Sequence, residues 1–173
     1  IIRRAGQDDR MGEERIVFME QGFVYIDEAA KGIRWDAKYA TWDNFTGKPV
    51  EGYASNRIVG TEALGKGIAK AQEMASSLGY GLLLWDGYRP SRAVESFLHW
   101  AGQPEQEEAK QRYYPNIHKA DLIRKGYIAE RSAHSRGGTV DLTLYNKMSG
   151  ELVPMGGGFD FMDVRSHHDA GEV

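Results

Sequence analysis

The stretch Gly81-Leu82-Leu83-Leu84-Trp85-Asp86-Gly87-Tyr88-Arg89-Pro90 joins a compact apolar run to a group of polar residues. Residues 81–85 lie between glycines, which is typical of a buried strand. From Ser91 to Ala101 apolar side chains recur at helical spacing, and Pro90 suits the first turn of a helix because its ring fixes φ. We therefore expect a strand, a polar turn and a helix in direct succession.

Two further segments have a clear period. Residues 61–78 repeat apolar side chains at helical spacing, and Gly79 then ends the pattern. Residues 139–145 alternate apolar and polar side chains, which predicts a half-buried strand. The weaker patterns predict a strand at 23–26, loop and short strand at 35–45, a further helix at 120–125 and a hairpin partner for the 139–145 strand at 151–155, while the polar, acidic stretch 103–110 is assigned no element.

The bulk composition is that of one globular domain. The chain has 173 residues and 19.4 kDa, with 41% hydrophobic and 27% charged residues, so it is expected to fold around its own core. Residues 1–18 have no clear period and are interpreted as an N-terminal extension before a domain at 19–173. The net charge of -3, spread without long runs of one sign, makes nucleic acid an unexpected partner.

The absence of cysteine limits any metal site to histidine and carboxylate ligands. The sequence contains no run of 18 apolar residues, which argues against a membrane span, and residues 1–18 are too charged for a signal peptide. We therefore expect a cytoplasmic protein with no membrane association. Its oligomeric state is not indicated by the sequence.

The segment Ser132-Ala133-His134-Ser135-Arg136-Gly137-Gly138-Thr139-Val140-Asp141 carries the most specific chemistry. Imidazole and carboxylate suit Zn²⁺, and the glycines allow the backbone to turn so that His134 returns beside the strand that presents Asp141. On spacing alone, however, a hydrogen-bonded loop histidine and a solvated aspartate are the commoner arrangement.

The pattern S-x-H-S-R-G-x-x-x-D followed by L-T-L resembles the zinc-binding motif of the D-alanyl-D-alanine dipeptidases of the vancomycin-resistance type. Residues 34–49, 82–90 and 159–163 resemble the same family in order and spacing, and the resemblance extends from Met19 to about Gly171. It implies an α+β fold, with a small, mainly antiparallel sheet flanked by helices, of the DD-peptidase and hedgehog-like zinc peptidase type.

The resemblance also implies the metal site. His134 and Asp141 would be two zinc ligands, and Arg89 would be a catalytic residue close to the metal. A guanidinium does not lose its proton at working pH, so it can stabilise the oxyanion of a tetrahedral intermediate. The alternative for Arg89 is a structural ion pair with Asp86.

Three substrate-binding residues are implied in the same way, namely Ser132, Tyr39 and Asp160, with Asp160 as the partner of the free ammonium group. Each has an ordinary alternative: Ser132 as the cap of a turn, Tyr39 as a core residue and Asp160 as the end of a strand.

The remaining histidines are interpreted as structural or surface groups. His99 falls on the helix after Pro90, and His118 lies near a predicted helix start. His167 and His168 are adjacent, and adjacent side chains point in different directions and rarely bind one metal together.

The sequence departs from the family at one important point. The family completes its zinc site with a downstream Glu-x-x-His motif that supplies the third ligand and the catalytic base, and the 173 residues contain no such motif. Because loss of a general base costs about 10²- to 10⁴-fold in rate, we expect the chain as printed to be inactive or nearly so and to lack the C-terminal end of the domain. Thr139, where the family usually has alanine, is a smaller departure.

The function implied by the resemblance is zinc-dependent hydrolysis of the dipeptide D-Ala-D-Ala to D-alanine. This would lower the pool used for cell-wall precursors and support glycopeptide resistance, or else serve nutrition. Two alternatives remain: a catalytically inactive binding module on the same fold, and a D,D-carboxypeptidase that acts on longer peptidoglycan peptides.

Overall fold

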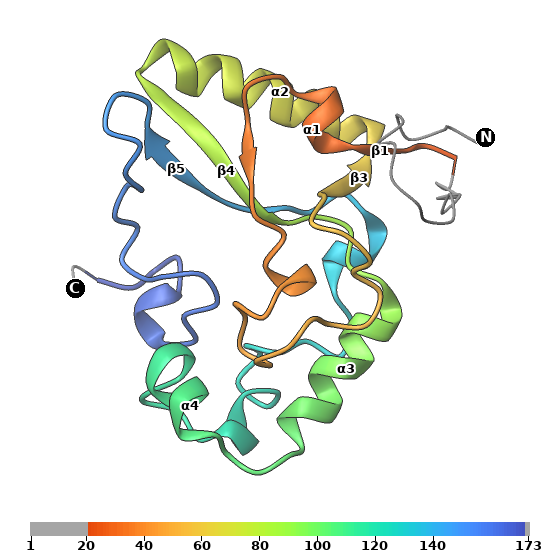
Figure 1. The fold of residues 1–173 in the computed structure, drawn as a ribbon. Coiled ribbons are helices and arrows are strands. Elements are labelled where there is room, and N and C mark those ends of the chain that lie inside the picture. Colours follow the sequence, from red (N-terminus) through yellow and green to blue (C-terminus); the bar gives the residue numbers. More distant parts are fainter. Residues whose placement is uncertain (1–20, 172–173) are drawn as a thin grey trace, which may run out of the picture.

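Strand β4 (Tyr80–Asp86) is the middle strand of a three-stranded sheet with the order β2-β4-β5. Strand β5 (Asp141–Asn146) pairs antiparallel with β4, and β2 (Arg34–Trp35) pairs parallel with it. An irregularity at the end of β4 places Asp86 opposite Asp141. The computed structural model describes residues 21–171 (Figure 1).

A second, two-stranded sheet lies at the start of the described chain. In it β1 (Phe23–Tyr25) pairs antiparallel with β3 (Val59–Thr61), and the short helix α1 (Ile26–Ala29) follows β1 directly. Within residues 21–171 the strand pairings are antiparallel except for the two-residue pairing of β2 with β4. The expected α+β fold with small, mainly antiparallel sheets is confirmed.

Helix α2 (Glu62–Ser77) packs against β4 of the larger sheet and crosses the top of the view in Figure 1. Thr61 caps it, because its hydroxyl oxygen accepts a hydrogen bond from the backbone N–H of Leu64 at 3.2 Å. The buried Gln72 joins the helix to the sheet: its Oε1 accepts from the N–H of Leu82 at 2.9 Å. Helix α2 contributes Ile68 to a hydrophobic core cluster that contains Ile26, Ala30, Ile33, Ala37, Ile58, Ile68, Leu82 and Leu84.

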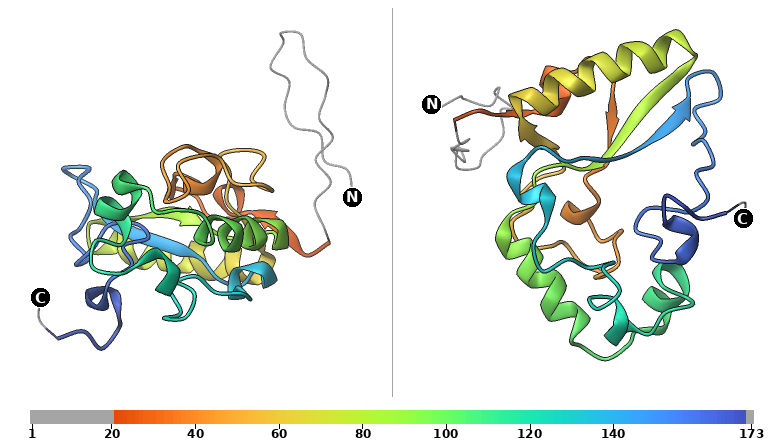
Figure 2. Two further views of the ribbon diagram at one scale, coloured as in Figure 1. Left: turned by 90° about the horizontal axis from the view of Figure 1, so that it is seen from below. Right: turned by 180° about the vertical axis from the view of Figure 1, so that it is seen from behind.

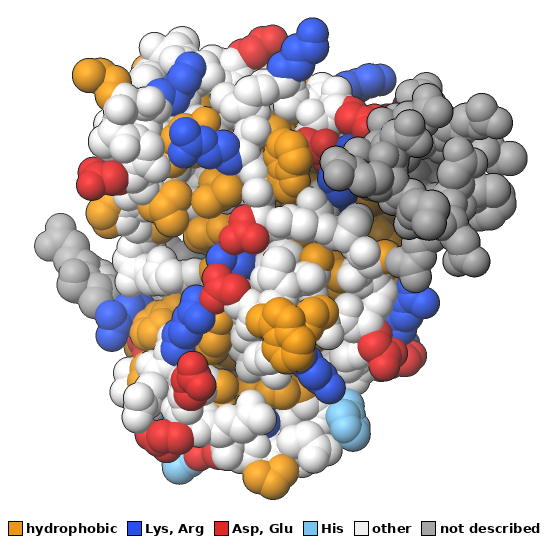
Figure 3. Space-filling view, viewed as in Figure 1, with side chains coloured by type: hydrophobic (Ala, Val, Ile, Leu, Met, Phe, Trp, Pro, Cys, Tyr) orange, Lys and Arg blue, Asp and Glu red, His pale blue; other side chains and the backbone are white. Residues whose placement is uncertain are grey.

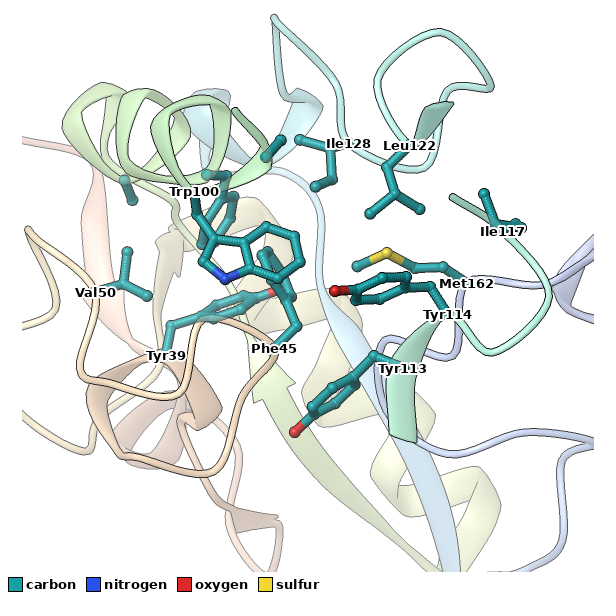
Figure 4. Close-up of a cluster of buried hydrophobic side chains, with 13 residues drawn as sticks. Tyr39, Phe45, Val50, Trp100, Tyr113, Tyr114, Ile117, Leu122, Ile128 and Met162 are labelled. Carbon is teal, nitrogen blue, oxygen red and sulfur yellow. The ribbon is translucent and has the colours of Figure 1, made fainter. Parts of the chain in front are cut away.

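The second half of the molecule is built around α3 (Ser91–Ala101) and α4 (Glu107–Tyr113), which lie below the sheet in Figure 1 and are seen from two further directions in Figure 2. Its core is rich in aromatic rings (Figure 4). The ring of Phe45 lies 4.9 Å from that of Phe97 on α3 and 4.7 Å from that of Trp100. Two hydrophobic clusters, one on each side of the end of β4, therefore hold the polar turn at 86–89 between them.

The helices expected at 61–78 and 91–101 and the strands expected at 81–85 and 139–145 are confirmed. The loop and short strand expected at 35–45 agree with β2 and the loop after it, whereas three other assignments need correction. The strand expected at 23–26 ends at Tyr25, and Ile26 begins a helix. The helix expected at 120–125 is wrong: a 3-10 helix at Lys119–Asp121 and turns are found there.

The expected hairpin partner at 151–155 is reduced to one bridge, between Leu152 and Tyr145. Helix α4 was not predicted, because its seven residues bury only Tyr113 and offer too short an apolar pattern to recognise. The extension at 1–18 and the domain start at Met19 lie outside the described residues.

Surface charges of both signs are intermixed on the face shown in Figure 3. Within residues 21–171, no helix has the length and apolar character that a membrane crossing requires.

Gly137 allows the chain to reverse before β5. It ends the short 3-10 helix Ala133–Arg136 with φ of +71°, and its carbonyl accepts a hydrogen bond from the N–H of Thr61 at 2.9 Å. A Cβ atom at this position would overlap the ring of Phe23, whereas one at Gly138 would meet nothing within 4 Å. The two neighbouring glycines therefore have different roles.

We predict that Gly137→Ala lowers the free energy of unfolding by about 2 to 4 kcal/mol, since it adds left-handed strain and overpacking. The matched variant Gly138→Ala should change it by less than about 1 kcal/mol. Urea denaturation of both variants measures the difference. Equal stability of the two variants would contradict this assignment.

Candidate metal centre

The backbone holds His134 beside the end of β4. His134 lies in the 3-10 helix Ala133–Arg136. Ser132 caps this helix, because its Oγ accepts a hydrogen bond from the N–H of His134 at 3.2 Å. The carbonyl of His134 in turn accepts from the N–H of Arg89 at 3.2 Å. The loop before β5 is thus fastened directly to the turn after β4.

The imidazole of His134 is oriented by a second backbone contact. Its Nδ1 lies 2.9 Å from the carbonyl oxygen of Gly87, so a neutral ring donates from Nδ1 and keeps the lone pair on Nε2. That Nε2 lies 3.4 Å from Oδ1 of Asp141, the first residue of β5. Burial lowers the pKa of His134, but the interaction with Asp141 outweighs it and leaves the pKa above 6.5. The expected meeting of His134 and Asp141 is found in the structure.

A third residue, Asp86, completes a cluster that could hold a metal ion. One ligand atom each from Asp86, His134 and Asp141 lies within 4.8 Å of the others. His134 is buried, and the side chain of Asp141 is about one-third exposed. Nitrogen and oxygen atoms gathered at this spacing are a donor set suited to a divalent cation.

The carboxylate of Asp86 already has four hydrogen-bond donors. Its Oδ1 accepts from the hydroxyl of Tyr53 at 2.8 Å and from the N–H of Gly87 at 2.9 Å. Its Oδ2 accepts from Nε and Nη2 of Arg89 at 3.0 and 2.8 Å. Burial raises the pKa of Asp86 to about 6, with Arg89 opposing it, so the group is mainly charged at neutral pH. Asp86 is better placed to orient its neighbours than to bind a metal.

Arg89 reaches from this carboxylate toward the metal ligands. Its Nη2 lies 3.5 Å from Oδ2 of Asp141, and its guanidinium carbon lies 5.1 Å from the ring centres of both Tyr39 and Phe97. The ion pair with Asp86 and the position near the predicted ligands therefore occur together. The ion pair with Asp86 therefore orients the guanidinium and leaves it close to Asp141.

Tyr39 and Asp160 meet on another wall of the same region. The buried hydroxyl of Tyr39 donates to Oδ2 of Asp160 at 2.6 Å. The ring of the neighbouring Phe159 packs 5.3 Å from Trp85 on β4 and 5.5 Å from Tyr39. Asp160 has φ of +53°, the only non-glycine residue of 21–171 with a positive φ. Strain of this kind is often found where a side chain must point in a functional direction.

The structure places Ser132 next to His134 but gives its hydroxyl the role of a cap. This is the alternative considered from the sequence, and contact with a substrate stays a prediction. The surface interpretation of the other histidines is confirmed, because His99, His118, His167 and His168 are all exposed.

Sequence reasoning missed two contributors to the site. The carbonyl of Gly87 carries no side-chain signal, although its place between Asp86 and Arg89 at the end of a strand could have drawn attention to it. Tyr53 lies in a loop 33 residues before Asp86, and no local pattern indicates that its hydroxyl reaches this carboxylate.

The chain is similar in sequence to the D-ala-D-ala dipeptidases. The sequence profile of the D-ala-D-ala dipeptidase family, peptidase family M15, matches residues 19–173. The D-alanyl-D-alanine dipeptidase of Enterococcus faecalis is 64% identical over 152 residues, covering 88% of this chain and 75% of the relative. Those of Streptomyces coelicolor and Enterococcus faecium are 63% and 62% identical over 155 residues, in each case 90% of this chain and 77% of the relative. The chain therefore belongs to the D-ala-D-ala dipeptidase family, as its resemblance to these peptidases predicted.

Proposed function

We propose that this protein is a zinc-dependent dipeptidase that hydrolyses D-Ala-D-Ala to free D-alanine. The proposal is supported by family membership and by one observation above the others, the position of His134 Nε2 opposite Asp141 with Arg89 beside them. We further propose that it acts in the cytoplasm, where it lowers the dipeptide pool for cell-wall precursors and supports glycopeptide resistance.

The donor atoms fit zinc. His134 offers an unprotonated Nε2, because Nδ1 is engaged by Gly87, and Asp141 offers a carboxylate oxygen. Bound zinc would polarise the scissile carbonyl and lower the pKa of a water molecule. A catalytic zinc usually has three protein ligands, and we assign the third ligand and the general base to no residue of 21–171. The expectation that a Glu-x-x-His motif supplies both stays a prediction.

Arg89 would stabilise the negative charge that develops on the carbonyl oxygen during attack. It is suited to this because its side chain is only 15% exposed, it keeps its proton, and Asp86 fixes two of its N–H groups. Its remaining N–H groups are available toward the region of Asp141. The positive charge of the guanidinium would thus already face the position of the developing oxyanion before the reaction begins.

Asp160 would bind the free ammonium group of the dipeptide, with Tyr39 holding its carboxylate and Ser132 contacting the substrate nearby. Burial raises the pKa of Asp160 to about 7; the hydrogen bond from Tyr39 lowers it and the charge of Asp141 raises it. Ionisation of a buried carboxylate is unfavourable without a partner, so a bound cation stabilises its charged form strongly. Recognition of a free ammonium group by Asp160 would favour a dipeptide over a longer peptide.

Substrate choice tests the proposal against its alternatives. Turnover measurements need protein that carries the third zinc ligand and the general base. With it we expect turnover of D-Ala-D-Ala, with little or none for L-Ala-L-Ala or for a pentapeptide ending in D-Ala-D-Ala, measured as released alanine in the presence of zinc. Preferential cleavage of the pentapeptide would instead favour a carboxypeptidase. Binding of dipeptide without cleavage would favour an inactive binding module.

Removing one metal ligand should weaken zinc binding. We predict that His134→Ala and Asp141→Asn each lower zinc affinity by at least about 100-fold, measured by competition with a chromophoric chelator, and lower turnover in parallel. The control is His99→Ala, which changes an exposed histidine on α3 and should leave both quantities unaltered. Equal zinc affinity of the wild type and His134→Ala would refute the role of His134.

The pKa of Asp160 yields a prediction that is independent of activity. Because the folded-state pKa of about 7 exceeds the ordinary 3.8, the folded protein binds the proton more tightly, so this group lowers stability as pH rises from about 4 to 7. Asp160→Asn removes the unfavourable ionisation of the buried carboxyl group and keeps an oxygen that can accept the hydrogen bond from Tyr39. In metal-free protein it should raise the free energy of unfolding by about 1 to 2 kcal/mol at pH 8 and leave it nearly unchanged at pH 4.

Asp163→Asn provides a control of opposite sign. The hydrogen bond from Asn116 lowers the pKa of Asp163, so loss of this carboxylate should decrease stability at pH 8. Denaturant titrations at both pH values measure the two effects. A gain for Asp160→Asn of the same size at pH 4 and pH 8 would contradict the raised pKa.

A further inference from the structure

Tyr53 lies between the two parts of the candidate site. Its hydroxyl donates to Oδ1 of Asp86 at 2.8 Å, and its ring packs 5.5 Å from the ring of Tyr39, which binds Asp160. The side chain thus contacts the residue that holds Arg89 and the residue that holds Asp160. The proposed mechanism assigns it no role.

The two oxygens of Asp86 divide their donors in a way that makes Tyr53 important. Oδ2 accepts both hydrogen bonds from Arg89, while Oδ1 accepts from Tyr53 and from the N–H of Gly87. A carboxylate is planar, so donors on one oxygen limit its rotation and thereby fix the direction of the other. Asp86 is 1% exposed, which leaves little access for solvent to replace a lost donor.

A cavity of about 620 Å³ lies beside this hydrogen bond. Tyr53 and Asp86 line it together with Tyr25, Tyr88 and other residues, whereas His134, Asp141 and Arg89 are not among its lining residues. The ring of Tyr53 packs against the aromatic core cluster that contains Tyr39. This packing holds the ring, and the hydrogen bond to Asp86 fixes where the hydroxyl points.

The hydroxyl of Tyr53 is a permanent donor. Burial, assisted by the charge of Asp86, raises the pKa of Tyr53 far above its usual value of 10, so the group keeps its proton throughout the working pH range. A group that keeps its proton can orient a carboxylate but does not serve as a base.

We propose that Tyr53 is a positioning residue for peptide hydrolysis: its hydroxyl fixes the Asp86 carboxylate, and through it the guanidinium of Arg89, in the direction of the developing oxyanion. This inference rests on the proposed function and extends it to a residue outside the metal ligands and substrate contacts. Arg89 touches the reacting atoms in this account, and Tyr53 acts only through Asp86.

The test begins with Tyr53→Phe, which keeps the ring against Tyr39 and removes only the donor. We expect kcat to fall about 10-fold with KM changed less than about 2-fold and zinc affinity unaltered, since the loss concerns the transition state. The matched control is Tyr25→Phe, on the wall of the same cavity, whose hydroxyl makes no hydrogen bond to residues 21–171. This control should have wild-type kinetics.

A double-mutant cycle tests the route of the effect. In an Arg89→Lys background, which lacks the fork of N–H groups, Tyr53→Phe should cost less than about 2-fold further. The same 10-fold loss in both backgrounds, or wild-type kcat for Tyr53→Phe, would overturn the proposal. So would a loss of zinc affinity equal to the loss of rate.

A binding measurement separates this inference from the proposed function. A phosphinate analogue of the dipeptide carries the tetrahedral negative charge that Arg89 would meet, and calorimetry reports its affinity without turnover. We expect Tyr53→Phe to weaken phosphinate binding about 10-fold and to leave D-alanine binding unaltered. If the wild type and Tyr53→Phe bind the phosphinate equally tightly, the role of Tyr53 is wrong but the proposed function stands. If the wild type shows neither turnover nor phosphinate binding, both proposals are wrong.

Discussion

The arrangement of the site depends on the hydrogen bond between Nδ1 of His134 and the carbonyl oxygen of Gly87, 2.9 Å apart. A neutral imidazole has one donor and one acceptor nitrogen, so this bond decides that Nε2 is the atom with the free lone pair. It also turns Nε2 toward Asp141. The acceptor is a backbone atom at the end of β4, which makes the orientation of the ring a consequence of the fold.

One turn, residues 86–89, supports several parts of the site. Asp86 accepts from Arg89, Gly87 accepts from the imidazole, and the N–H of Arg89 donates to the carbonyl of His134. Because β4 lies between β2 and β5 and is covered by α2, this turn has a rigid base. The two hydrophobic clusters on either side of it contribute to function by keeping these backbone atoms in place.

Much of this architecture could be predicted from local pattern. Helices α2 and α3 and strands β4 and β5 each have a clear apolar period, and the glycines before β5 indicated that His134 could return beside Asp141. The rest depends on tertiary contacts. The hydroxyl of Tyr53 reaches Asp86 across 33 residues of sequence, and α4 is stabilised by packing of one tyrosine rather than by its own pattern. The roles assigned to Ser132, Tyr39 and Asp160 stay predictions.

The most direct test is the ¹⁵N NMR spectrum of the His134 ring, assigned by comparison with His134→Ala and recorded at pH 8 without and with one equivalent of zinc. Neutral His134 is expected to be protonated at Nδ1, to keep this proton when zinc is added, and to show a metal-induced shift of its Nε2 resonance. A ring protonated at Nε2, or a zinc-induced loss of the Nδ1 proton, would contradict this expectation.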